Sequence, residues 1–398
     1  MFGNVGSVTR TATEEPSRLV AFVARGKVFS GGPGRPLSEI HSKHVQAITD
    51  RAERSRAMHA WKEGTTFGIR AGGQLRQSAD DATPLQATAV QFVDQDRLLY
   101  FLRDRSAGGL FERNLVDGSE KRLLHRQNLL LDDLRVDVAS GKMLASQLSK
   151  NGAASIVSME LNGDGYRELT AGDTIDASPA FVPGKPNEVL FQSAGLARSQ
   201  QGYVLAQGPF SIQHLDIARG TLTLVCEDRG FDHLQPRVAP GGDLLFIRRP
   251  YEAVRYRTSD ALLDTLYFPF RVLRALFHYL NFFSLMYARK PLTSASGPEV
   301  EADLKSILVK GRHIDAETAL RKRAFVSGVP SLVPASWQLV RRTPTGEEHV
   351  LAKHVVAYDV APDGTVLFSN GNGVFAVDGD GAATVVLRDR LVGEIAAG

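Results

Sequence analysis

The sequence predicts an all-β fold, a single closed β-propeller of six blades with a helical insertion in one blade and a helix near the N-terminus. Two repeated patterns support the propeller. In the first pattern, an apolar stretch ends in a short turn, usually with glycine, that leads into the next strand. Successive copies start 44 to 57 residues apart, except for one gap of 122 residues that holds a long insertion. A period of this size is typical of propeller blades. The copies span residues 90–102, 134–146, 179–193, 236–248 and 358–370.

The second pattern is a pair of strands joined by a polar turn, and it follows each copy of the first. Asp-Gly and Asn-Gly at these turns allow the positive φ that a tight hairpin requires. Together the two patterns give four strands per blade. The five pairs span residues 114–124, 159–170, 215–225, 339–351 and 375–387.

A sixth, irregular blade is predicted near the N-terminus, from residues 18–32 and 65–69. The alternating segment 391–398 can pair with this blade and close the ring, because an open propeller would leave an exposed sheet edge. Residues 1–17 are small and polar, and we expect them to form a flexible leader.

The repeat also carries a family resemblance. Residues 179–191 and 236–246 resemble the repeat of TolB-type and WD-repeat-like bacterial propellers, and the same style of repeat occurs in the propeller of prolyl-oligopeptidase-type enzymes. The resemblance covers about residues 84–250 and 336–390. Ala361-Pro-Asp-Gly matches its turn best, whereas other copies replace Ser-Pro-Asp with Val-Pro-Gly, Ala-Pro-Gly or Ala-Ser-Gly. The resemblance implies the fold and leaves the activity open.

The expected compartment is the cytoplasm. Cys226 is the one cysteine, so no disulfide can form within the chain. Glu14 and Glu15 lie in an N-terminal segment that has no apolar stretch of a secretory signal. This expectation differs from TolB-type proteins, which are exported to the periplasm.

A helix is predicted near the N-terminus, over residues 36–64. Val45, Ile48 and Ala52 recur at helical spacing, and Ser42 can cap the first turn. The helix either lies across the first blade with a solvated basic face or docks onto a partner.

Within a propeller expected over residues 18–398, residues 251–334 are predicted to form a helical insertion. Its main element is an amphipathic helix over 269–287, opened by Pro269. Two further helices are expected over 298–309 and 315–325. The helix 269–287 combines a narrow polar stripe with a wide apolar arc, and its candidate contact residues are Phe270, Arg271, Arg274, Phe277, His278, Leu280, Phe282, Phe283 and Met286.

Three environments for this apolar arc are open: the insertion's own helices, a protein partner or second copy, and a membrane surface. In the central part of the insertion, the longest stretch without Asp, Glu, Lys or Arg is residues 275–288. It is shorter than the roughly 20 residues that span a bilayer. Residues 248–325 carry a net charge of +6 (fourteen Lys or Arg against eight Asp or Glu), compared with +3 for the whole chain. This local excess would attract an acidic protein or anionic lipid. No nucleic-acid motif accompanies it, so no nucleic-acid partner is expected.

Motifs of catalysis are missing from the sequence. It contains no G-x-S-x-G elbow, P-loop, H-E-x-x-H motif or paired cysteine ligands, so we predict no catalytic residue, metal or cofactor. Polar residues just before or on the first strand of several blades can line a channel mouth and hold a small ligand. They are Asp132, Asp133, Asp176, His233, Gln235 and Asp359.

The predicted function is that of a non-catalytic cytoplasmic scaffold. Its propeller face would bind protein partners, and its amphipathic insertion would dock onto an assembly or a membrane surface. The alternative is a propeller-type lyase or hydrolase with a polar or metal site at the mouth of the central channel. An enzyme should bring at least three of the candidate acidic and histidine side chains together there.

Overall fold

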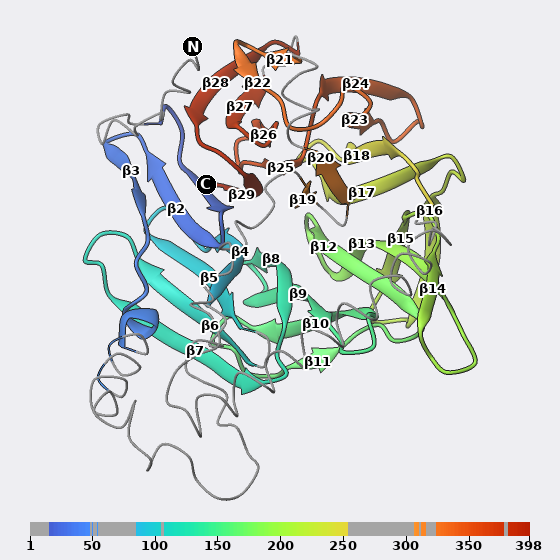
Figure 1. Cartoon of the computed structure of the whole chain (residues 1–398), viewed down its shortest axis with the longest axis horizontal. Coiled ribbons are helices and arrows are strands. Elements are labelled where there is room, and N and C mark those ends of the chain that lie inside the picture. Colours follow the sequence, from blue (N-terminus) through green and yellow to red (C-terminus); the bar gives the residue numbers. More distant parts are fainter. Residues whose placement is uncertain are drawn as a thin grey trace, which may run out of the picture.

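The computed structural model describes residues 16–47, 50, 54, 85–104, 107–253, 306–309, 312–315, 324–377 and 381–398. These residues are almost entirely β-structure, as the sequence predicts, with a short helical turn at residues 43–47. Four-stranded antiparallel units are arranged around a common centre (Figure 1).

The first unit combines strands from opposite ends of the sequence. β29 pairs with β1 from Val20↔Ala397 to Ala24↔Val392, which confirms the predicted pairing of the C-terminal segment with the first blade. Its order is β29-β1-β2-β3, with β1 at Val20–Ala24, β2 at Lys27–Gly32, β3 at Arg35–Glu39 and β29 at Val392–Ala397. The second unit contains β4 (Gln86–Phe92), β5 (Arg97–Arg103), β6 (Ala107–Asn114) and β7 (Glu120–Gln127).

The next two units belong to one nine-stranded sheet, in which a single parallel pair, Ala154↔Ile175, connects them. The third unit contains β8 (Leu131–Asp137), β9 (Lys142–Leu148), β10 (Ala154–Glu160) and β11 (Arg167–Glu168). The fourth contains β12 (Thr174–Val182), β13 (Lys185–Arg198), β15 (Ser211–Asp216) and β16 (Thr221–Cys226), with β14 (Val204–Gln207) paired to the end of β13.

In the fifth unit, β18 pairs directly with β23, although the long insertion separates them in sequence. The unit contains β17 (Phe231–Val238), β18 (Leu244–Pro250), β23 (Gln338–Arg342) and β24 (Glu348–Lys353). The sixth contains β25 (Ala357–Val360), β26 (Val366–Ser369), β27 (Gly373–Val377) and β28 (Ala383–Arg388). Two small hairpins precede β23, namely β19 (Ser306–Val309) with β20 (Arg312–Asp315), and β21 (Phe325–Val326) with β22 (Val329–Pro330).

In the second to sixth units, the first sequence pattern contains the turn between the first two strands. The second pattern contains the turn between the last two strands, as in β15–β16 and β27–β28. Gly118 and Gly163, in turns of the second pattern, have φ of 67° and 89°, which confirms the turn chemistry predicted there.

Neighbouring units pack face to face. The strand that begins the order of each unit contacts the corresponding strand of the next unit. These contacts run from β29 to β4, β8, β12, β17 and β25, and from β25 back to β29. Apolar clusters fill the spaces between units; Phe22 and Phe29 of the first unit, for example, share a cluster with Leu367 and Val374 of the sixth. Each sheet thus buries apolar side chains on both faces, which is why second strands such as β5 and β26 are nearly continuous apolar runs.

Three helix predictions are wrong in part where the structure describes the residues. The predicted helix 36–64 starts too early, because Pro36 to Glu39 belong to the outer strand β3. Ser42 does cap the turn that follows, accepting a hydrogen bond from the Val45 amide at 3.4 Å. Within the insertion, β19 and β20 replace parts of the predicted helices 298–309 and 315–325. Their β-branched residues on either side of Lys-Gly favour a hairpin.

The other sequence predictions on the insertion and the N-terminus lie outside the described residues. They include residues 1–15 of the leader 1–17, the strand 65–69 and the amphipathic helix 269–287. Within the described residues, no helix is long and apolar enough to cross a membrane.

Candidate functional site

Three inner strands share a local distortion at the centre of the molecule. Asp133 of β8, Ser178 of β12 and Gln235 of β17 have φ of 53°, 52° and 53°, and each lies where the register with the second strand shifts. Such β-bulges redirect side chains and backbone amides locally. Because the bulge recurs at the same place in three repeats, it is a feature of the blade itself.

The bulge amides connect neighbouring units. The Ser178 amide donates hydrogen bonds to Asp133 Oδ2 and Ser146 Oγ of the third unit, both at 3.1 Å. The Gln235 amide donates to Gln192 Oε1 of the fourth unit at 2.7 Å. Polar side chains of one unit therefore satisfy buried amides of the next, as buried backbone groups require.

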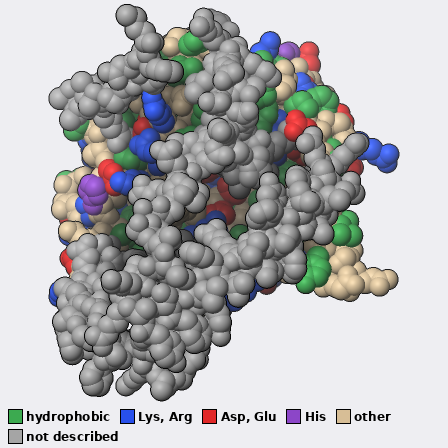
Figure 2. Space-filling model, viewed as in Figure 1, with side chains coloured by type: hydrophobic (Ala, Val, Ile, Leu, Met, Phe, Trp, Pro, Cys, Tyr) green, Lys and Arg blue, Asp and Glu red, His purple; other side chains and the backbone are tan. Residues whose placement is uncertain are grey.

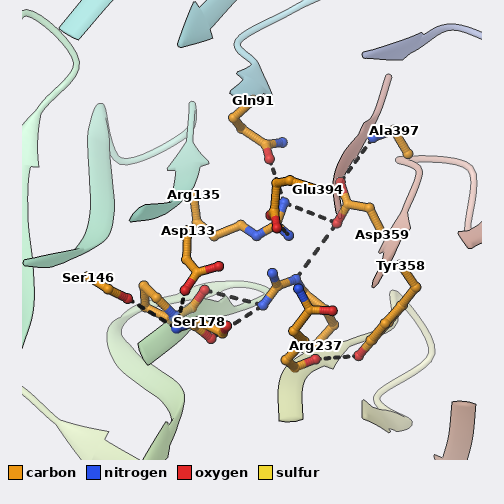
Figure 3. A network of polar contacts seen from close by, with 12 residues as sticks. Gln91, Asp133, Arg135, Ser146, Ser178, Arg237, Tyr358, Asp359, Glu394 and Ala397 are labelled. Carbon is orange, nitrogen blue, oxygen red and sulfur yellow. Dashed lines mark hydrogen bonds and ion pairs between the residues drawn. The ribbon is translucent and has the colours of Figure 1, made fainter. Parts of the chain in front are cut away.

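A buried ionic network lies beside these bulges (Figure 3). Arg135 Nη1 of β8 is 3.2 Å from Asp359 Oδ1 of β25, and Arg237 Nε of β17 is 3.7 Å from the same oxygen. All three residues are at most 6% exposed. One carboxylate thus bridges two arginines from two other units.

Two further strands contribute to the network. Arg135 Nη1 donates to Gln91 Oε1 of β4 at 2.5 Å, and Arg135 Nη2 lies 3.8 Å from Glu394 Oε1 of β29. The Ala397 amide donates to Asp359 Oδ2 at 3.0 Å. The network therefore includes residues of five units. Figure 2 shows basic and acidic side chains near the middle of the viewed face, between the residues drawn in grey.

Backbone carbonyls stabilise the second arginine. Arg237 Nη1 donates to the carbonyl oxygens of Ser178, Pro179 and Pro236 at 3.4, 3.3 and 2.7 Å. Burial, together with repulsion from Arg135, lowers the pKa of Arg237 to about 10. Arg237 stays charged at neutral pH, and its charge carries a desolvation penalty.

The network also has unfilled hydrogen-bonding capacity. Among the described residues, Nε and Nη2 of both Arg135 and Arg237 have no hydrogen-bond acceptor, and both side-chain atoms of Gln235 have no partner. Gln235 is 1% exposed. The centre therefore contains polar groups that water or a small ligand could satisfy.

The sequence-predicted channel residues are divided among several environments. Asp133, Gln235 and Asp359 lie in or beside the network, whereas Asp132 pairs with Arg103 at 3.3 Å. Asp176 Oδ1 accepts a hydrogen bond from Ser193 Oγ at 2.6 Å.

The last of these candidates, His233, lines a separate polar pocket of about 360 Å³ between the fourth and fifth units. Burial lowers the pKa of His233 and raises that of Cys226 in the same pocket. A second histidine, His354, makes a backbone contact instead: its Nδ1 lies 2.8 Å from the Val333 carbonyl oxygen. Within the described residues, no group of three or more His, Cys, Asp or Glu side chains could hold a metal ion.

The sequence analysis missed the two arginines, although the repeat contains a signal for them. Arg135-Val136 and Arg237-Val238 occupy the same position in two copies, where an inner strand should be apolar. A charged residue recurring at a buried position requires a buried counter-charge. The predicted contact residues Phe270, Arg271, Arg274, Phe277, His278, Leu280, Phe282, Phe283 and Met286 lie outside the described residues.

Comparisons with known proteins identify a fold. No protein-family model matches the chain, and no curated protein does. Among solved structures, TolB from Acinetobacter baumannii is similar with a TM-score of 0.50 and 12% identity, over 97% of this chain and 67% of TolB. A structure from the nidogen/laminin complex has a TM-score of 0.48 and 9% identity, covering 95% of this chain and 97% of that one. The tricorn protease has a TM-score of 0.42 and 9% identity, covering 95% and 34%.

The structural similarity to TolB shows that the chain has a β-propeller fold of the TolB type. At 12% identity it shows the fold alone.

Proposed function

We propose that the chain is a closed six-bladed β-propeller that acts as a non-catalytic scaffold for protein partners in the cytoplasm. The observation that supports this proposal most is that the central charged groups already interact with one another. Asp359 bridges Arg135 and Arg237 and accepts the Ala397 amide, so its carboxylate is committed to contacts between units. A general base or nucleophile needs a free group within reach of a substrate.

Ring closure is supported by two kinds of contact. The pairing of β29 with β1 completes the first unit, and β25 of the sixth unit contacts β29. Six four-stranded units account for the inner strands in sequence order. A ring held together in this way offers rigid faces on which loops can recruit extended segments of other proteins.

The docking element in this proposal is the amphipathic segment 269–287. β18 and β23 pair directly across the insertion, so the hydrogen bonding of this sheet needs no strand from the residues between them. The wide apolar arc of the segment must be buried against another surface. The net positive charge of residues 248–325 favours an acidic protein surface or anionic lipid.

The experiment replaces residues 254–305 with a Gly/Ser linker. The described residues 324–334 are kept, because Val329, Leu332 and Val333 are buried against the propeller. A matched variant with Phe277→Ser, Leu280→Ser and Phe283→Ser retains the length of the insertion. Both variants should keep the β-sheet circular dichroism of the parent chain and lose either a co-purifying protein or binding to anionic vesicles.

Two results would contradict the proposal. If both variants fold and keep every interaction of the parent, the insertion is not the docking element. If the parent turns over an ester, peptide or glycosidic substrate and Asp359→Asn abolishes turnover without unfolding the protein, the channel is catalytic.

A further inference from the structure

The polar pocket between the fourth and fifth units, at the right of Figure 1, shares no residue with the central ionic network. It is lined by the end of β16 and the loop that follows, by residues of β17, β18, β23 and β24, and by the turn between the last two strands. Its volume of about 360 Å³ falls in the range of small-molecule sites. Because most of its side chains are polar, hydrogen bonds and charge determine which ligand it can hold.

The pocket contains a buried histidine with unfilled hydrogen-bonding capacity. His233 is 4% exposed, and its Nδ1 atom has no hydrogen-bond partner among the described residues. The ring packs against Phe246, with the ring centroids 5.1 Å apart. A buried polar atom without a partner is unfavourable, so it indicates that a group from outside the protein completes its hydrogen bonding.

One of the two arginines of the pocket is available to an anionic group. Arg248 is already paired, because its Nη1 lies 3.0 Å from Glu348 Oε2 and its Nη2 donates to Gln338 Oε1 at 3.1 Å. Arg342 is half-buried, and its Nη1 donates to the Val225 carbonyl at 3.3 Å. Among the described residues Arg342 forms no ion pair, so its charge can bind a carboxylate of a ligand.

Two exposed carboxylates, those of Glu227 and Asp228, also line the pocket. Asp228 Oδ1 accepts a hydrogen bond from the Gly230 amide at 2.7 Å, which fixes this side chain in the loop after β16. The charges of Asp228 and Glu348 oppose the lowering of the pKa of His233 by burial, so both act on the buried histidine. Carboxylates in this position can accept hydrogen bonds from an ammonium group.

The charges of the lining distinguish between classes of ligand. Two arginines, Arg248 and Arg342, face three carboxylates, those of Glu227, Asp228 and Glu348. This excess of negative charge disfavours a dianion such as phosphate, whereas a simple cation would leave Arg342 without a counter-ion. Within the described part of the chain, no group of three or more His, Cys, Asp or Glu side chains could hold a metal ion. A ligand with one negative and one positive group satisfies both kinds of side chain.

We propose that this pocket binds a small zwitterion of the amino-acid type, which carries one carboxylate and one ammonium group. The carboxylate pairs with Arg342 and accepts a hydrogen bond from the ring of His233, and the ammonium group donates to Asp228. Burial raises the pKa of Cys226, so its thiol stays neutral at neutral pH and adds no further negative charge to the lining.

The test is isothermal titration calorimetry of the full chain with glycine, β-alanine and γ-aminobutyrate, which differ in the distance between their two charged groups. We expect at least one of them to bind with a dissociation constant below about 1 mM. Acetate and methylamine should bind at least about tenfold more weakly, because each can form only one of the two ion pairs. Inorganic phosphate should not bind. If none of the three zwitterions binds, or if acetate, methylamine or phosphate binds as tightly, the proposal is wrong.

Two variants test the charged groups. Arg342→Gln should weaken binding of the zwitterion at least about tenfold, because a charge-assisted hydrogen bond is lost. Asp228→Asn keeps an acceptor for the Gly230 amide and should weaken binding about fivefold through its charge. Arg341→Gln is the matched control and should leave binding unchanged. Arg341 is the neighbouring residue on β23, points to the opposite face and pairs with Asp243 at 4.0 Å.

A third variant separates binding from stability. His233→Phe keeps a ring that can pack against Phe246 and removes both ring nitrogens. It should weaken binding at least about threefold, while the urea midpoint of the unliganded protein stays the same or rises, because an unpartnered buried polar atom is removed. Binding that tolerates Arg342→Gln or His233→Phe, or that falls equally in Arg341→Gln, would overturn the proposal.

Discussion

Removing the carboxylate of Asp359 tests whether the central network is a structural core. In Asp359→Ala, Arg237 loses its nearest carboxylate, and Arg135 keeps Gln91 at 2.5 Å and the carboxylate of Glu394 at 3.8 Å. The Ala397 amide also loses its acceptor. The perturbation thus leaves two buried cations with too little compensating charge.

The size of the effect follows from burial. Both arginines are 6% exposed, and removing one partner of a buried ion pair typically costs about 3–5 kcal/mol. The pKa of Arg237, lowered to about 10 by burial and by Arg135, indicates that its charge is incompletely compensated even with Asp359 present. We therefore expect Asp359→Ala to lower the free energy of unfolding by about 3–5 kcal/mol.

Urea unfolding followed by circular dichroism measures this loss through the midpoint and the slope. Asp132→Ala is the control, because Asp132 pairs with Arg103 at a partly exposed site and should cost less than about 1 kcal/mol. Arg237→Met combined with Asp359→Ala should cost less than the sum of the single changes. If Asp359→Ala costs no more than Asp132→Ala, the centre is hydrated and open, and the reasoning from burial is wrong.

Three further predictions concern other buried positions. Burial lowers the pKa of His233, against the opposing effects of Glu348 and Asp228, so the unfolded state takes up this proton first as pH falls. Stability should therefore decrease as pH falls below about 6.5, and His233→Gln should reduce that decrease in urea titrations whereas the exposed His349→Gln should not. Tyr358→Phe should cost about 1–2 kcal/mol, because the Tyr358 hydroxyl lies 2.6 and 2.7 Å from two buried carbonyl oxygens and donates its one proton to either of them; an unchanged urea midpoint would contradict this. Gly108→Ala should cost about 1–3 kcal/mol, since its Cβ would lie 2.2 Å from a backbone oxygen, whereas Gly195→Ala has open space; equal thermal midpoints would refute the difference.

The fold could be predicted from the sequence because each unit repeats its own local signals. Alternation and Gly-bearing turns recur within each copy, and they specify β4–β5 or β27–β28 without reference to distant residues. The hairpin β19–β20 was missed because short apolar runs fit helix and strand periods almost equally well.

The candidate site could be predicted only in part. Asp133, Gln235 and Asp359 were found from their positions before or on inner strands, but the pairing of Asp359 with Arg135 and Arg237 joins residues more than 100 positions apart. No local pattern encodes such a contact. It follows from the arrangement of the units around a common centre, which brings together strands of units that are not adjacent.

The pairing of β29 with β1 has a consequence for biosynthesis. During translation, residues 20–24 are made about 370 residues before their partners at residues 392–397. Until then the nascent chain presents β1 as an unpaired edge, and the Asp359 carboxylate lacks the Ala397 amide. Completion of the first unit must therefore bring together segments separated by about 370 residues, at a high loop-closure cost. Ribosome-bound intermediates are consequently the stage at which this protein depends most on protection from aggregation.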